Sequence, residues 1–151
     1  MSFEPKYGRI RVYLAGDISD ADRWRPKVSE ALEGLNVNFL SPIDRIKYAR
    51  INVENRKNKV FEHCDYLKID RADVVFCYIR KCKSLHSGSS AEIGYAKAKG
   101  KLIILCIDLP KETAYLYEFI RRTATETFDN LGDAIDYLRA LVEEMNYDPT
   151  A

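Results

Sequence analysis

The sequence predicts an α/β fold: a single doubly wound, flavodoxin-like (Rossmann-like) parallel sheet of five strands. Short apolar runs alternate with longer segments of helical periodicity along the chain, which is typical of such folds. Two of the runs, residues 72–79 and 102–107, are almost continuously apolar, as strands buried on both faces of a parallel sheet are. Between them, residues 87–101 read as a small-residue turn followed by a helix. The three segments together predict a βαβ unit.

The N-terminal half supplies the first two strands. Residues 9–15 are predicted to form a strand that ends at Gly16. A helix is expected from about residue 21 to 35, with Pro26 in its early turns, where proline is tolerated. A short second strand follows at 37–40.

The middle of the chain is less regular before its long helix. Residues 42–54 have weak periodicity and are predicted to form an ordered loop. Residues 55–71 have apolar side chains spaced for one face of a helix, which leads into the third strand.

The C-terminal part completes the pattern. A short helix is predicted at 113–122, a fifth strand at 125–128 and an amphipathic helix at 133–145. The natural strand order for this series is 2-1-3-4-5, which leaves a crevice between the first and third strands. We expect one domain over residues 1–151, large enough to bury roughly two-thirds of its unfolded surface.

Composition excludes several classes of partner. The net charge is +1, so no overall electrostatic attraction to nucleic acid is expected. No apolar run approaches the ~20 residues of a membrane helix, and the N-terminus lacks a signal-peptide pattern. The four cysteines have no paired CxxC spacing, which argues against a zinc site. We therefore expect a cytoplasmic protein without metal, cofactor, nucleic-acid partner or membrane partner.

Three familiar occupants of such a crevice are disfavoured by missing motifs. After the first strand Gly16 stands alone, whereas a dinucleotide fold requires G-x-G-x-x-G. The chain has no Gly-Lys-Ser/Thr ending of a P-loop. The third strand ends in Tyr78-Ile79-Arg80, without the aspartate of a phosphoacceptor domain.

One carboxylate, Glu92, is expected in the first turn of the helix that follows the small-residue turn. The spacing Ser89-Ser90-Ala91-Glu92 fits a capping box, in which the glutamate only closes the helix start. A chemical role is the alternative, because Gly88 and three serines supply more small polar groups than a cap needs. The sequence alone leaves both open. The other acidic candidates are Asp17, Asp65 and Asp73, of which Asp73 more simply starts a strand.

Several short blocks form a series in chain order: Tyr13-Leu14-Ala15-Gly16, Trp24-Arg25, Asp65, Asp73-Val74-Val75, residues 87–96 and Gly100-Lys101. Together they closely resemble the nucleoside 2-deoxyribosyltransferase superfamily. That superfamily includes base-exchanging transferases and 2′-deoxynucleoside 5′-monophosphate N-glycosidases. The resemblance extends over nearly the whole chain, and its most specific block is Glu-Ile-Gly-Tyr-Ala.

The resemblance implies a set of catalytic residues. Glu92 matches the nucleophile that attacks the anomeric carbon of the sugar. Asp65 matches the aspartate that helps to protonate the leaving base, and Tyr13 matches a strand tyrosine near the sugar. A retaining mechanism of this kind needs an ionised carboxylate and a proton donor to the base.

The same resemblance implies where substrate binds, with one departure. Transferases of the superfamily carry an aspartate six positions before the nucleophile, where this chain has His86. Its nucleotide hydrolases instead hold a 5′-phosphate with small residues in this loop, as Ser87, Gly88 and Ser89 suggest here. The predicted substrate-binding residues are Gly16, Asp17, Ile18, Arg25, Tyr78, His86, Ser87, Gly88 and Ser89.

Three functions therefore remain as hypotheses. The first is transfer of the sugar from a nucleoside or nucleotide to a free nucleobase through a covalent intermediate on Glu92. The second is hydrolysis of a nucleoside 5′-monophosphate with water as acceptor. The third is a nucleotide-binding module without catalysis. The resemblance and the aromatic stretch at 115–120 also predict a homodimer or a higher even homo-oligomer.

Overall fold

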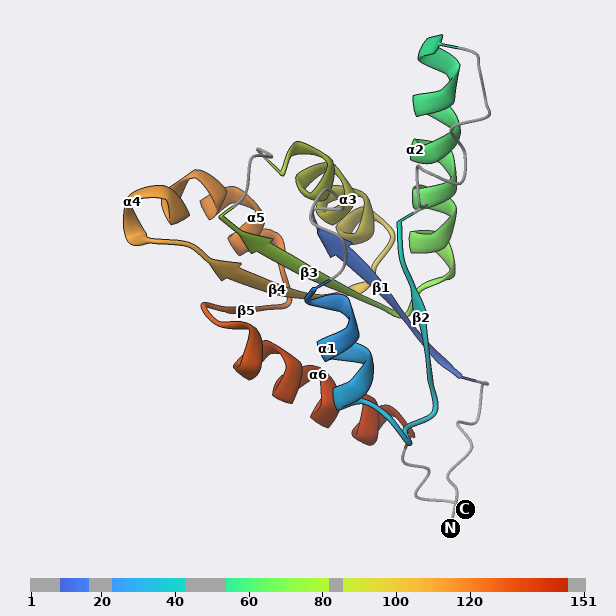
Figure 1. The fold of residues 1–151 in the computed structure, drawn as a ribbon, viewed down its shortest axis with the longest axis vertical. Coiled ribbons are helices and arrows are strands. Elements are labelled where there is room, and N and C mark those ends of the chain that lie inside the picture. The colour runs from blue at the N-terminus through green and yellow to red at the C-terminus, as the bar shows by residue number, and fades with distance from the viewer. Residues whose placement is uncertain (1–8, 17–22, 43–53, 82–85, 147–151) are drawn as a thin grey trace.

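Five parallel strands form one sheet at the centre of the computed structural model, which describes residues 9–16, 23–42, 54–81 and 86–146 (Figure 1). The strand order is β2-β1-β3-β4-β5, as the sequence predicts. All four neighbouring pairs are parallel. The strands are β1 (Ile10–Gly16), β2 (Val37–Leu40), β3 (Val74–Arg80), β4 (Leu102–Asp108) and β5 (Glu126–Phe128).

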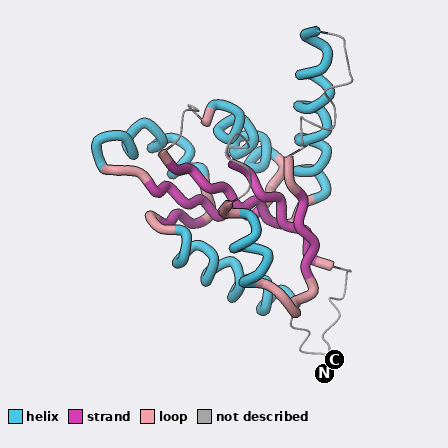
Figure 2. Tube along the Cα trace, in the orientation of Figure 1, coloured by secondary structure: helices cyan, strands magenta, loops and turns pink. Residues whose placement is uncertain are grey.

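Helices cover both faces of this sheet (Figure 2). On one face lie α1 (Arg25–Ala31) and α6 (Leu131–Asn146). On the other lie α2 (Glu54–Arg71), α3 (Ser87–Ala98) and α5 (Glu118–Thr123). Before α5 the chain forms the short helix α4 (Lys111–Ala114) and the 3₁₀ helix η1 (Tyr115–Tyr117). None of the helices in the described residues has the length and apolarity of a bilayer-spanning segment.

The central strand β3 divides its side chains between two apolar cores. Phe76 and Tyr78 belong to the core beneath α1 and α6. Val75, Cys77 and Ile79 belong to the core beneath α2 and α3. Since successive side chains of a strand point to opposite faces, a strand buried on both faces must be apolar throughout. This is why residues 74–79 carry no charge.

The predicted elements are confirmed, with differences at their ends. In the described residues the first helix covers only Arg25–Ala31, and the chain leaves it through a turn with Gly34 at φ 87°. The helix predicted at 113–122 is divided into α4, η1 and α5. Most of the predicted loop 42–54 lies outside the described residues.

Asp73 has the structural role that its position suggests. Its Oδ2 accepts a hydrogen bond from the Arg11 backbone N–H at 2.8 Å. Its own N–H donates to the Arg11 carbonyl at 2.8 Å. Asp73 thereby joins β1 to the amino end of β3, at the edge of the sheet opposite the carboxyl ends.

Gly16 is expected to be intolerant of any side chain. Its φ is +155°, and an added Cβ would lie 2.7 Å from Trp24 Cζ2 and 3.0 Å from the Tyr78 carbonyl oxygen. We expect Gly16→Ala to lower the free energy of unfolding by about 2–4 kcal/mol, through overpacking and backbone strain together. Urea denaturation measures this. Gly94→Ala is the control, because a Cβ there meets nothing within 4 Å and should stabilise α3 by about 0.5–1 kcal/mol. Equal stability of wild type and Gly16→Ala would contradict the prediction.

Candidate functional site

The candidate site lies where β1 and β3 end side by side. β2 stops opposite Tyr13, whereas β1 continues for three more residues, of which Gly16 pairs with Tyr78. The next element on one side is α1 and on the other α3, because the strand order changes direction at β1 and β3. Open α/β sheets bind their ligands at such a switch point.

The start of α3 places Glu92 differently from the sequence prediction. The helix begins at Ser87 with His86 as its N-cap, so Glu92 is its sixth residue and lies in the second turn. The first turn contains no acidic residue, and no side chain caps it. Instead the Ser90 N–H and Oγ both donate to the His86 carbonyl oxygen, each at 3.0 Å. The capping-box interpretation of Glu92 is therefore wrong, because the helix starts three residues earlier than that motif requires.

Glu92 lies above two fully buried groups of the sheet, Tyr13 from β1 and Cys77 from β3. Burial raises the pKa of the Tyr13 hydroxyl, and the negative charges of Glu92 and Asp65 raise it further. Burial also raises the pKa of the Cys77 thiol, again with Glu92 as the next cause. Tyr13 and Cys77 thus stay neutral beneath the two carboxylates.

The Tyr13 hydroxyl approaches Glu92 without forming a well-aligned hydrogen bond. It acts electrostatically on the glutamate, and a side-chain hydrogen bond to Glu92 is one of the smaller causes of its raised pKa. By strict geometry, however, the oxygen has no partner among the described residues. The approach of the Tyr13 hydroxyl to Glu92 is therefore a loose contact, of the kind that often tightens when a ligand binds.

Two aromatic side chains hold α2 against α3 and so set the position of Asp65 relative to Glu92. The ring of Tyr66, the neighbour of Asp65, lies 4.6 Å from the ring of Tyr95, one turn beyond Glu92. The Tyr95 hydroxyl donates to Asp70 Oδ1 at 2.6 Å. Asp65 and Glu92 are both half-buried, so both stay within reach of a ligand.

The Arg25 guanidinium is buried at the carboxyl end of β1. Its Nη2 donates to the carbonyl oxygens of Leu14, at 3.3 Å, and of Gly16, at 3.4 Å. Its Cζ lies 4.5 Å from the centre of the Trp24 ring. The positive charge lowers the pKa values of both Tyr13 and Cys77, which opposes the effect of burial.

The side chain of Tyr78 is not brought to Glu92, because it lies on the opposite face of the sheet. Its hydroxyl donates to Asp108 Oδ2 at 3.2 Å, and its ring lies 5.4 Å from that of Trp24. Burial first and the Asp108 charge second raise the pKa of Tyr78 to about 12.

His86 is a buried loop residue and not a solvated one. Its side chain is 3% exposed, and Nε2 makes a 2.8 Å hydrogen bond with the Arg80 carbonyl oxygen. The ring meets that of Tyr117 edge-on at 6.0 Å. Its backbone is left-handed, with φ 53°. His86 thus fixes the path from β3 into α3.

The remaining predicted residues are only partly accounted for. Gly88 is exposed and Ser89 is buried, where a hydrogen bond from Ser89 stabilises the thiolate form of Cys77. Asp17 and Ile18 lie outside the described residues, as does the side chain of Ser87. Cys77 is the residue that sequence reasoning missed. The alternation of β3 carries the signal, because residues 75, 77 and 79 share the face that α3 covers.

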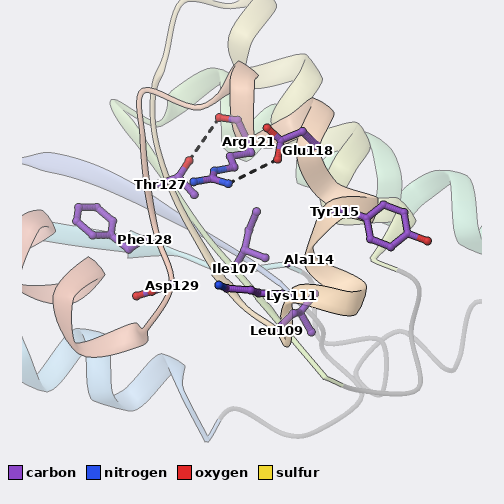
Figure 3. Close-up of a pocket in the computed structure, with 10 residues that line it drawn as sticks. All are labelled: Ile107, Leu109, Lys111, Ala114, Tyr115, Glu118, Arg121, Thr127, Phe128 and Asp129. Carbon is purple, nitrogen blue, oxygen red and sulfur yellow. Dashed lines mark hydrogen bonds and ion pairs between the residues drawn. The ribbon is translucent and has the colours of Figure 1, made fainter.

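A separate cavity of about 670 Å³ lies at the ends of β4 and β5 (Figure 3). Its walls come from α4, η1 and α5 and from β5 with the residue after it, and its charged lining residues are Lys111, Glu118, Arg121 and Asp129. Arg121 and Glu118, one turn apart on α5, pair at 3.6 Å on one wall of the cavity. None of the groups around Glu92 lines this cavity. Within the part of the chain that the structure describes, no three His, Cys, Asp or Glu side chains are grouped to hold a metal ion.

Comparison with known proteins gives a family match and a set of similar structures. The model of the family "Nucleoside 2-deoxyribosyltransferase like" matches residues 9–109. A 2-deoxyribosyltransferase from Bacillus psychrosaccharolyticus is 19% identical, with a TM-score of 0.63 over 87% of this chain and 95% of that one. A 2-deoxyribosyltransferase from Leishmania mexicana is 17% identical, with a TM-score of 0.65 over 87% and 97%. The CMP N-glycosidase of Clostridium botulinum is 19% identical, with a TM-score of 0.55 over 87% and 98%. No curated protein matches the chain in sequence.

Proposed function

The chain belongs to the nucleoside 2-deoxyribosyltransferase-like family, and we propose that it cleaves the N-glycosidic bond of a (deoxy)nucleoside or nucleotide through a covalent glycosyl–Glu92 intermediate. In this proposal the sugar is then transferred to another nucleobase. The observation that carries it is the placement of Glu92. The residue lies in the second turn of α3 and does not cap the helix; its charge acts on the neutral Tyr13 and Cys77, and the charge of Asp65 acts on the same Tyr13 hydroxyl.

The proposed reaction has two displacements at one carbon. A Glu92 carboxylate oxygen attacks the anomeric carbon as the C–N bond breaks, and the electron pair of that bond leaves with the base. Asp65 gives the base its proton, because a nucleobase anion leaves poorly. The incoming base then attacks the same carbon, expels the Glu92 carboxylate and loses a proton to Asp65. Two inversions give overall retention.

Tyr13 assists as a neutral donor. With its pKa raised by burial and by two carboxylates, its phenol keeps its proton throughout the physiological range. A neutral phenol beside Glu92 donates a hydrogen bond to the glutamate or to the sugar without adding a third negative charge. We assign substrate contacts to the loops around it: Gly16, Asp17, Ile18, His86, Ser87, Gly88 and Ser89.

Hydrolysis of a nucleoside 5′-monophosphate is the second candidate. It uses the same glycosyl–Glu92 intermediate, but water resolves it. Two observations support it: His86 replaces the aspartate of the transferases, and its ring makes a hydrogen bond with the Arg80 carbonyl oxygen and packs edge-on against Tyr117. The small residues that follow leave room for a phosphate near the N-terminus of α3.

Replacing the nucleophile is the first test. We expect Glu92→Gln to lower base release at least about 1,000-fold, because amide nitrogen and oxygen replace the attacking carboxylate. Intact mass spectrometry should show a glycosyl adduct on quenched wild type and none on the variant. Glu144→Gln on the exposed face of α6 is the matched control and should keep full activity. A nucleotide that raises the melting temperature but is recovered intact from wild type would support a binding module instead.

The identity of the acceptor is the second test. Wild type is incubated with deoxynucleosides, or with their 5′-monophosphates, in the presence and absence of a second base. We expect a new nucleoside to form when the second base is added, since base and water compete for one glycosyl–enzyme. Free base released from monophosphates alone, without exchange, would favour the hydrolase.

We also propose that the chain forms a homodimer or higher even homo-oligomer. Its support is an exposed apolar patch on η1 and α5, formed by Tyr115, Leu116 and Phe119, of which Phe119 is 84% exposed. Monomeric proteins seldom leave such large side chains grouped in water. The patch borders the cavity of Figure 3, which Tyr115 helps to line.

A charge in this patch is expected to dissociate the oligomer. Phe119→Glu should raise the dissociation constant at least about tenfold, because a carboxylate resists burial in an apolar interface. Light scattering over a dilution series measures this, with Glu112→Gln as an exposed control on α4. A wild-type mass of 17.4 kDa at working concentration would show that the chain is a monomer.

A further inference from the structure

β1 has an open backbone edge near the candidate site. The Ile10 N–H bonds to Asn36 on the β2 side, whereas Arg11 bonds to Asp73 on the β3 side. Because the backbone groups of a strand alternate in direction, the carbonyls of the even-numbered residues of β1 face β2. The last pair between these strands is Tyr13 with Leu40. The carbonyls of Leu14 and Gly16 therefore point to the β2 side of β1, beyond the last pair of the two strands.

The Arg25 side chain occupies this position. Its Nη2 bonds to both of these carbonyls, and only 6% of the residue is exposed. A planar guanidinium suits the task, since it has five N–H donors fixed in one plane. A buried carbonyl without a partner would destabilise the fold, because it gives up its hydrogen bonds to water without replacement.

The neighbouring residue Trp24 holds Arg25 in place. Trp24, beside it, is 3% exposed and packs against Phe76 and Tyr78 on the α1 face of the sheet. The guanidinium lies over the Trp24 ring, a cation–π contact that favours the buried charge. Its charge also lowers the pKa values of Tyr13 and Cys77, which lie on the other face of the sheet. Arg25 therefore lies at the carboxyl end of β1, between the two cores.

We propose that Arg25 is a positioning residue, which binds the β1 carbonyls beyond the last β1–β2 pair and holds the end of β1, and with it Tyr13, in register beneath Glu92. This differs from the substrate-binding role that the sequence predicts for Arg25. The catalytic part of the proposal rests on the proposed function. The structural part, the closing of an open strand edge, does not.

The structural part is tested by the fluorescence of Trp24, the single tryptophan of the chain. In wild type, acrylamide should quench this buried indole weakly. Arg25→Met removes the guanidinium donors and the charge but keeps a side chain of similar length. It should raise the quenching constant at least about twofold, because the end of β1 and Trp24 become more accessible to acrylamide. Arg25→Lys, which keeps the charge but not the guanidinium, should fall between them. Lys27→Met on the same helix is the exposed control and should match wild type.

The catalytic part is tested with a deoxynucleoside and its 5′-monophosphate, at a temperature where circular dichroism shows each variant folded. We expect kcat to fall roughly 10–100-fold in Arg25→Met, equally for both substrates, with KM little changed, because a misplaced site loses rate rather than binding. Arg25→Lys should recover part of the loss, and serves alone if Arg25→Met does not fold.

The outcomes separate the two proposals. A rise in KM for the monophosphate alone would show that Arg25 binds phosphate and would overturn its positioning role. Unchanged quenching in both Arg25 variants, or unchanged kcat, would also overturn it. Wild type that releases no base from either substrate would overturn the proposed function and, with it, the catalytic part. The quenching result would then decide the structural part by itself.

Discussion

The candidate site depends on the unequal lengths of β1 and β2. A parallel sheet covered on both faces offers polar groups to a ligand only at its ends, because everything between is apolar core. Here β2 stops at Leu40 while β1 continues to Gly16, so one strand end projects beyond its neighbour. Tyr13 lies at the last shared position of the two strands. The groups that bind the carbonyls at the end of β1 therefore also decide how firmly Tyr13 is held.

Burial then assigns the charges around Tyr13. A phenol and a thiol that are both removed from water resist ionisation, and nearby carboxylates make ionisation harder still. Tyr13 and Cys77 meet both conditions. The carboxylates that act on Tyr13 are those of the half-buried Glu92, on α3, and Asp65, on α2.

The sequence predicted the sheet well and the start of α3 poorly, for one physical reason. Strand order follows from the alternation of apolar runs and helices, a signal repeated along the whole chain. The start of a helix depends instead on one or two backbone angles. His86 adopts a left-handed conformation held by its contacts with Arg80 and Tyr117, residues that sequence spacing does not connect to it. The helix consequently begins at Ser87, and Glu92 moves from the first turn to the second.

The same limit applies to which face a side chain occupies. Tyr13 and Tyr78 look equivalent in the sequence, as tyrosines in two neighbouring strands, but they lie on opposite faces of the sheet. Register decides this: Tyr13 pairs with Val75, and Tyr78 with Gly16, so the two tyrosines differ by an odd number of steps along the ladder. Only the strand whose tyrosine faces α3 contributes it to Glu92. A family motif therefore identifies residue types at a site more securely than it identifies which of them contact the ligand.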